Sequence, residues 1–233
     1  ITAGQSNFTS VATTAYAPTN GSALDNLNPY NGQMYVASDP LLGSSVSSQV
    51  APFGVGSLSL RLADKFVTNG IFGRVIIVPL AVGGTASSTW GTGGPLYNRV
   101  PAAMARLASR GIVPGMTGVT FAFCWGQGES DAATTQIAYQ TSLTQVLTSL
   151  FNAGFVGRAF INKQTLLSNV ANPTVVAAQV AVVNGTTIFQ GADADALTGA
   201  GNRMADNTHF NDTGMANLAT AMYNAMHATG SPF

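Results

Sequence analysis

Three polar residues of this sequence have the types and spacing that nucleophilic catalysis needs. Ser6 lies in a tight Gly-Gln-Ser-Asn turn directly after an apolar start, and a serine hydroxyl is a weak nucleophile unless a base lies within hydrogen-bond reach. His209 follows Asp206 by three residues in a loop before a helical pattern, so the carboxylate can hold one ring nitrogen while the other points outward. We therefore expect Ser6 to act as nucleophile, His209 as base and Asp206 as the acid that orients it. The other histidine, His227, falls on the last turn of the last predicted helix, where its charge suits the helix dipole, and we expect it to be structural.

Donors for an oxyanion are also present. A serine in a tight turn offers its own backbone N–H, and the pair Gly83-Gly84 after a predicted strand offers another, because glycine lets a backbone approach closely. The side-chain amide of Gln127 follows a third predicted strand. Because all three follow the ends of predicted strands, we expect the Ser6 N–H, an N–H of the Gly83-Gly84 pair and the Gln127 amide to converge as oxyanion donors.

Short apolar runs rich in β-branched residues alternate with longer helical patterns. The runs at 74–80, 119–125, 154–162 and 186–191, together with residues 1–3, predict buried strands of a parallel sheet. Apolar residues at helical spacing predict helices within 56–70, 97–110, 139–150, 172–183 and 215–226. Asp212 is expected to cap the last of them. This alternation predicts a three-layer α/β/α sandwich with a central, mainly parallel five-stranded sheet, whose ligands bind beyond the carboxyl ends of the strands.

The segment from Ala12 to Pro52 departs from this alternation. It is rich in Asn, Ser, Pro and Gly and has no clear period, and loops of this length are usually functional. We expect it to cover the sheet edge or to border the mouth of the site.

Composition excludes several kinds of protein. The 233 residues suit one domain, 46% are hydrophobic, and only 8% are charged, with nine basic and nine acidic side chains. Without a run of Lys or Arg, a nucleic-acid partner is not expected. No apolar stretch is long enough to span a bilayer. The single cysteine, Cys124, is expected to be a small buried hydrophobe, and two histidines are too few for a typical metal-hydrolase site.

Four blocks of this sequence resemble a known superfamily. GQSN at 4–7, GGT at 83–85 followed by Trp90, WGQGESD at 125–131 and DNTH at 206–209 occur in the order found in SGNH hydrolases. Within that superfamily the chain is similar to the sialate O-acetylesterase-like branch, which includes the acetylxylan esterases of carbohydrate esterase family six. The blocks span nearly the whole chain.

The resemblance implies an activity and a set of site residues. It implies a serine esterase that deacetylates carbohydrates without metal or organic cofactor, with Ser6, His209 and Asp206 as the triad. It also implies an oxyanion hole formed by the N–H groups of Ser6 and Gly84 and the side chain of Gln127, with Gly83 as the alternative to Gly84. It implies that Glu129 joins loops by accepting hydrogen bonds rather than transferring a proton. Asn7 is expected to brace the nucleophile turn, and Trp90 either to line a substrate subsite or to pack on the sheet. One departure is Phe8, where the branch often has methionine, and we expect this position to shape the pocket.

Alternatives concern substrate and context. Residues 1–233 are expected to form a single esterase domain within a longer protein, because residues 1–3 make only the end of a strand. We favour an extracellular, secreted or virion-associated protein. A general short-chain esterase is the first alternative, and a glycan-binding module of a larger assembly, such as a phage tail, is the second. A two-carboxylate glycosidase would leave the serine, histidine and aspartate unexplained.

Overall fold

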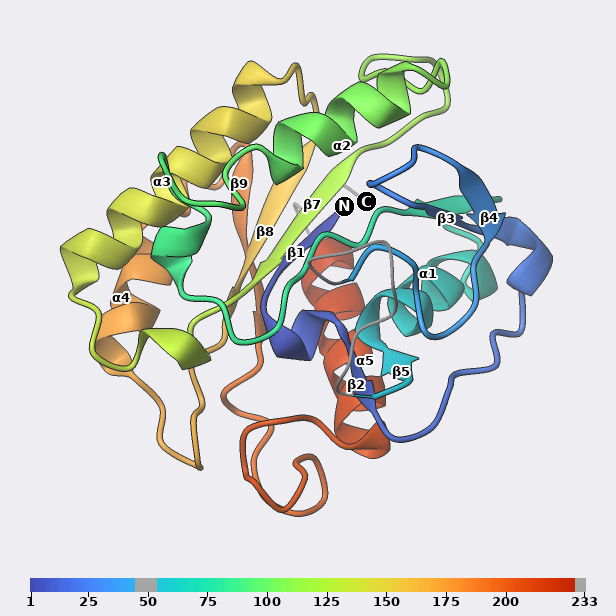
Figure 1. The fold of residues 1–233 in the computed structure, drawn as a ribbon. Helices are drawn as coiled ribbons and strands as arrows, with labels where there is room; N and C mark the ends of the chain where they lie inside the picture. The colour runs from blue at the N-terminus through green and yellow to red at the C-terminus, as the bar shows by residue number, and fades with distance from the viewer. Residues whose placement is uncertain (45–53, 229–233) are drawn as a thin grey trace.

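The computed structural model describes residues 1–44 and 54–228 (Figure 1). The strands are β1 (Thr2–Gly4), β2 (Ser10–Ala12), β3 (Leu24–Leu27), β4 (Met34–Val36), β5 (Gly56–Ser57), β6 (Val75–Ile77), β7 (Ala122–Gly126), β8 (Arg158–Lys163) and β9 (Ile188–Asp193). The α-helices are α1 (Leu58–Thr68), α2 (Arg99–Ala108), α3 (Gln136–Asn152), α4 (Pro173–Ala181) and α5 (Asp212–His227). Short 3₁₀ helices are η1 (Ser6–Phe8), η2 (Gly21–Ala23), η3 (Ser87–Thr89) and η4 (Glu129–Asp131).

The central sheet has the order β1-β7-β8-β9, and all its neighbouring strands are parallel. Helices α2, α3 and α4 lie on one face and α1 and α5 on the other (Figure 1). Each helix layer shares a separate hydrophobic core with the sheet. The predicted α/β/α sandwich is therefore confirmed.

The predicted strand count is wrong by one. The run at 74–80 contributes β6, which belongs to a second sheet of order β4-β3-β6 and meets β1 only at an isolated bridge between Thr2 and Pro79. Beside this bridge, Thr2 N donates to Val78 O (3.0 Å). Backbone bonds from Leu80 N to Thr2 O (2.7 Å) and from Val82 N to Gly4 O (2.9 Å) still hold the following loop against β1.

The segment 12–52 is more regular than its sequence indicates, as far as the structure describes it. It contributes β3, parallel to β6, and β4, antiparallel to β3. These strands extend the sheet system at the β6 edge, which fits the first of the two expected roles, covering of the sheet edge. The remainder of this segment, residues 45–52, lies outside the described residues.

Asparagine side chains cap the first turns of α4 and α5. Asn172 accepts hydrogen bonds from Thr174 N and Val175 N and begins α4, with proline at its first position. The expected cap of α5 by Asp212 is wrong, because Asn211 is extended and accepts the Gly214 N–H at 2.8 Å. The Asp212 carboxylate instead binds Thr13 and Thr14.

Candidate active site

Ser6 is presented at the carboxyl end of β1. The strand ends as Gln5 N donates to Gly126 O of β7 (3.0 Å), and the chain turns at once into η1. Both Thr9 N (2.9 Å) and Thr9 Oγ1 (2.6 Å) donate to the Ser6 carbonyl, which fixes the turn. The serine thus lies in a short rigid turn rather than in a long loop.

Phe8 lies beneath this turn. Its side chain is buried in the core shared with α5, and a Cβ built on Gly126 would stand 2.0 Å from the ring. Glycine at 126 is therefore required by the close approach of the ring. Phe8 supports the strand under Ser6, and with 1% exposure it has little surface to offer a substrate.

The structure brings together the three residues predicted as a triad. His209 Nε2 lies 2.9 Å from Ser6 Oγ, although 203 residues separate them in the chain. His209 Nδ1 lies 2.6 Å from Asp206 Oδ2. With the proton on Nδ1, the ring donates to Asp206 and Nε2 accepts from the Ser6 hydroxyl. This is the geometry in which a histidine can remove a serine proton.

Asp206 is held in its charged form. Burial opposes ionisation, but hydrogen bonds from the His209 ring and from the backbone N–H groups of Thr208 and His209 outweigh it and lower the pKa of the carboxyl. Both N–H groups donate to Asp206 Oδ1 at 2.9 Å, which leaves Oδ2 for the ring. The backbone of this turn therefore orients the Asp206 carboxylate so that Oδ2 faces the imidazole of His209.

A neighbouring hairpin that the sequence analysis missed supports this turn. Leu167 and Val170 form an isolated antiparallel bridge, and the two residues between them, Ser168 and Asn169, have φ of 48° and 66°. Positive φ at both positions is the geometry of a type I′ turn. Ser168 N donates to Thr208 Oγ1 (2.8 Å) and Asn169 N to the carbonyl of residue 207 (3.1 Å). The sequence signal was weak, because Ser-Asn is less typical of this turn than Asn-Gly.

Asn7 links the nucleophile turn to the histidine loop. Its Nδ2 donates to Glu129 Oε1 (2.7 Å) and to Thr208 O (3.1 Å), and its Oδ1 accepts from Phe210 N (3.0 Å). The amide therefore contacts the residues on both sides of His209. This arrangement suits the bracing role predicted for Asn7.

Glu129 lies behind Asn7 and is buried. Its Oε1 accepts from Asn7 and from Gln164 Nε2 (3.0 Å). Burial raises the pKa of this carboxyl to about 7, although both hydrogen bonds act in the opposite direction. The contacts join three segments of the chain, as the predicted loop-joining role requires. Asp131 of the same block accepts hydrogen bonds from Ser87 and Thr134 instead.

Two of the three predicted oxyanion donors are available. The N–H groups of Ser6 and Gly84 donate to none of the residues that the structure describes. Gly84 is exposed with φ of 71°, a left-handed conformation that favours glycine, and its loop is tied to β1 through Val82.

Gln127 is oriented differently. Its side chain is fully buried, and its Nε2 donates to Thr85 O (3.0 Å) and to Asp131. In this arrangement both amide hydrogens face protein acceptors. Its role as third oxyanion donor stays a prediction, and it would require the amide to turn.

Trp90 lies in the core. It is 1% exposed, packs edge to face on Trp125 with 5.6 Å between ring centroids, and donates from Nε1 to Thr85 Oγ1 at 3.1 Å. Of the two roles considered for Trp90, packing on the sheet fits this position. Its buried ring has almost no surface left for a sugar.

Within residues 1–44 and 54–228 no group of three or more His, Cys, Asp or Glu side chains is placed to hold a metal ion. None of the helices in the same ranges is long and apolar enough to cross a membrane.

Comparison with known proteins identifies the class. A family model described as "carbohydrate esterase, sialic acid-specific acetylesterase" matches residues 1–228. The chain belongs to this family of carbohydrate esterases. No curated protein sequence matches the chain significantly.

Solved structures show the same fold. A protein from Arabidopsis thaliana is 20% identical with a TM-score of 0.73, the match covering 96% of this chain and 94% of the other. NanS is 18% identical with a TM-score of 0.63, covering 97% and 95%. YxiM from Bacillus subtilis is 14% identical with a TM-score of 0.51, covering 73% of this chain and 49% of the other.

Proposed function

We propose that this chain is a serine esterase that removes O-acetyl groups from carbohydrates through an acetyl-enzyme intermediate. The observation that carries the proposal is the contact of Ser6 Oγ with His209 Nε2 at 2.9 Å, with Asp206 at 2.6 Å behind the ring. The membership of a carbohydrate esterase family supports it independently.

Acylation follows from these contacts. Ser6 Oγ attacks the acetyl carbonyl carbon while its proton passes to His209 Nε2. Asp206 stabilises the imidazolium that forms. As the tetrahedral intermediate collapses, the bond to the sugar oxygen breaks and His209 delivers the proton to that oxygen, which leaves as a free hydroxyl.

Deacylation repeats these steps with water. His209 removes a proton from a water molecule that attacks the acetyl-Ser6 carbonyl, and the proton then returns to Ser6 Oγ as acetate leaves. In both halves the oxyanion is stabilised by the N–H groups of Ser6 and Gly84, which have no protein acceptor among the described residues. The side chain of Gln127 joins them if its amide turns outward.

The substrate is proposed to be an acetylated carbohydrate. The family description names a sialic acid-specific acetylesterase, and the four sequence blocks also resemble acetylxylan esterases. An acetyl group on a sialic acid or on xylan presents the same ester to Ser6. The two substrates differ in charge, so a comparison of both in one assay separates them.

Acetate release by wild-type protein and Ser6→Ala tests the proposal. We expect release from acetylated xylan or from O-acetylated sialic acid, and a loss of at least about 10³-fold in Ser6→Ala with an unchanged circular dichroism spectrum. Release from p-nitrophenyl acetate alone would favour a general short-chain esterase. Equal rates for wild type and Ser6→Ala would refute the serine mechanism. A folded protein inactive on every substrate would favour the glycan-binding module.

A further inference from the structure

Arg203 is a buried arginine on the loop that carries Asp206 and His209. It is 2% exposed and forms an isolated antiparallel bridge with Phe210. Its guanidinium donates to three backbone carbonyls: from Nη1 to Thr208 (2.7 Å), from Nη2 to Ala194 (2.5 Å) and from Nε to Leu197 (2.7 Å). One side chain thus joins the end of β9 to the loop before α5.

The same guanidinium packs on the residue after His209. Its Cζ lies 3.6 Å from the centroid of the Phe210 ring, which is within the range of a cation–π contact. Arg203 therefore holds the carbonyl of residue 208 and the ring of residue 210. His209 lies between these two fixed neighbours.

Asn7 acts on the same two residues from the opposite side. It donates to the Thr208 carbonyl that Arg203 also binds, and it accepts the Phe210 N–H. Because Asn7 follows Ser6 directly, the shared carbonyl connects the nucleophile turn to the arginine. Asn7 and Arg203 therefore hold the residues on both sides of His209 from two directions.

Arg203 is buried without a direct ion pair. Within the described part of the chain no carboxylate lies within 4.0 Å of the guanidinium. Burial lowers the pKa of Arg203 to about 10, although the more distant carboxylates of Glu129, Asp195 and Asp206 act in the opposite direction. Burying a cation whose direct partners are neutral carbonyls is costly. A planar guanidinium with diverging N–H groups can bind three carbonyls at once, whereas a lysine ammonium is a single point.

We infer that Arg203 is a positioning residue for His209, which it holds at the distance from Ser6 that proton transfer requires. The inference rests on the proposed serine mechanism. A positioning role of Arg203 differs from a purely structural one, because replacement of Arg203 should then lower turnover rather than the amount of folded protein.

Arg99 provides a matched control. Its guanidinium also donates to backbone carbonyls, those of Leu80 (2.6 Å) and Gly43 (2.5 Å), and lies over an aromatic ring, that of Tyr30 at 4.8 Å. It is on α2, and these contacts involve none of the triad residues. A general cost of replacing a carbonyl-binding arginine is therefore measured by Arg99→Lys.

The experiment compares Arg203→Lys with Arg99→Lys in acetate release and in thermal unfolding. We expect Arg203→Lys to lower kcat about 10- to 100-fold with KM within about two-fold, because a small misplacement of the base acts on the transition state. Arg99 is half-buried, so Arg99→Lys should lower the melting temperature by less than Arg203→Lys, and it should leave kcat within about two-fold. Wild-type kcat in folded Arg203→Lys would overturn the inference, as would equal losses of kcat in both variants.

A double-mutant cycle and a milder variant complete the test. Asn7→Ser and Arg203→Lys should be non-additive in kcat, because both act on the Thr208 carbonyl, and additive losses would contradict the shared role. If Arg203→Lys does not fold, Phe210→Leu removes the ring contact with Arg203 and keeps an apolar side chain in this buried position, and unchanged kcat in that variant would overturn the inference. The Ser6→Ala reference separates the two proposals: Ser6-independent turnover refutes the mechanism, whereas Ser6-dependent turnover with normal Arg203→Lys refutes only the positioning role.

Discussion

The two histidines lie near opposite ends of one helix. His209 precedes the first residue of α5 by three positions, and His227 is its last residue. The 16 residues between these ends span about 24 Å. The same residue type therefore occurs at the carboxyl and at the amino edge of the sheet.

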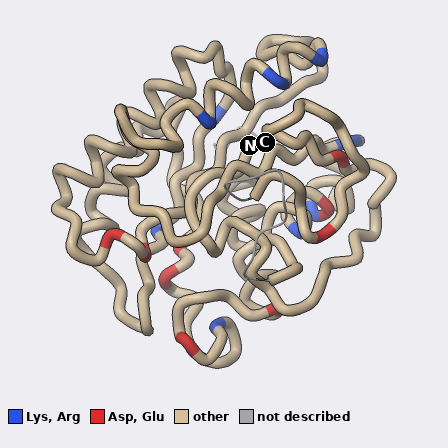
Figure 2. Tube along the Cα trace, viewed as in Figure 1, with Lys and Arg blue, Asp and Glu red and all other residues tan. Residues whose placement is uncertain are grey.

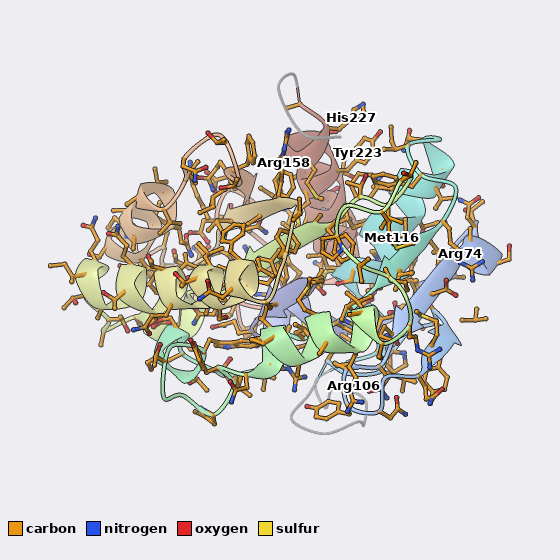
Figure 3. The ribbon with its side chains drawn as sticks, turned by 90° about the horizontal axis from the view of Figure 1, so that it is seen from above. Arg74, Arg106, Met116, Arg158, Tyr223 and His227 are labelled. Carbon is orange, nitrogen blue, oxygen red and sulfur yellow. The ribbon has the colours of Figure 1, made fainter. Side chains whose placement is uncertain are left out.

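Their surroundings differ in every respect that matters for proton transfer. His209 has a carboxylate on one ring nitrogen and a serine hydroxyl on the other. His227 is exposed and stacks on Tyr223, with 5.5 Å between ring centroids and 20° between planes (Figure 3). The comparison shows that partners, rather than residue type, distinguish the candidate base.

The two edges also differ in how they are filled. The carboxyl edge holds buried hydrogen-bonded groups such as Asn7 and Glu129. The amino edge has an apolar cavity of about 350 Å³, lined among others by Phe66, Phe121 and Cys124. Basic side chains (blue) lie along α2 near this edge, and acidic side chains (red) are frequent on the loops of the opposite edge (Figure 2). Ser6 is not among the residues that line this cavity, and the proposed chemistry rests on the contacts of the triad residues.

Replacing each histidine by alanine should give the largest difference between the two edges. We expect His209→Ala to lower kcat/KM by about 10³- to 10⁴-fold, because the base is lost, and His227→Ala to change it by less than about two-fold. Acetate release under identical conditions is the measurement. Equal effects of the two substitutions would remove the distinction between the edges.

Asp206→Asn should have the next largest effect. The asparagine keeps the shape but loses the charge that stabilises the imidazolium, and we expect kcat to fall about 10²- to 10³-fold. The Asp206 side chain is 47% exposed, so water replaces part of the lost interaction. The control is Asp212→Asn, a nearby carboxylate that binds Thr13 and Thr14, for which kcat should stay near wild type. A wild-type rate in Asp206→Asn would exclude the orienting role.

Glu129→Gln should change stability more than rate. Burial raises the pKa of Glu129 to about 7 from an ordinary value of 4.5, so the folded state holds this proton more tightly than the unfolded state. That contribution is complete below about pH 4.5 and is lost as the pH rises to about 7, by up to about 3 kcal/mol. The glutamine variant cannot titrate. We expect the melting temperature of Glu129→Gln relative to wild type to rise between about pH 5 and about pH 8, and a constant difference would contradict a buried, titrating Glu129.

The sequence predicted the triad because its members follow from local features. Ser6 comes directly after β1, and Asp206 and His209 share one turn, so each has a recognisable context. The carboxyl ends of parallel strands meet at one edge, which explains why residues 203 positions apart were expected to meet. Helices were predicted for the same reason, since their apolar periods are local.

What the sequence did not predict depends on contacts between distant segments. Arg203 is one of nine basic residues and lies in no motif, and only the fold brings it against Phe210 and Thr208. The inward orientation of Gln127 arises from Asp131 and Thr85, which take its amide hydrogens. The pairing of β6 with β3 rather than with β1 is likewise a contact between distant segments, which the local pattern of residues 74–80 does not reveal.

Covalent labelling can show whether Ser6 is a nucleophile that His209 activates. A fluorophosphonate forms a stable covalent bond with an activated serine, and peptide mass spectrometry locates it. We expect one label per chain on Ser6, lost in His209→Ala and kept in His227→Ala. A label on another residue, or Ser6 labelling that is unaffected by His209→Ala, would contradict the claim that His209 activates Ser6.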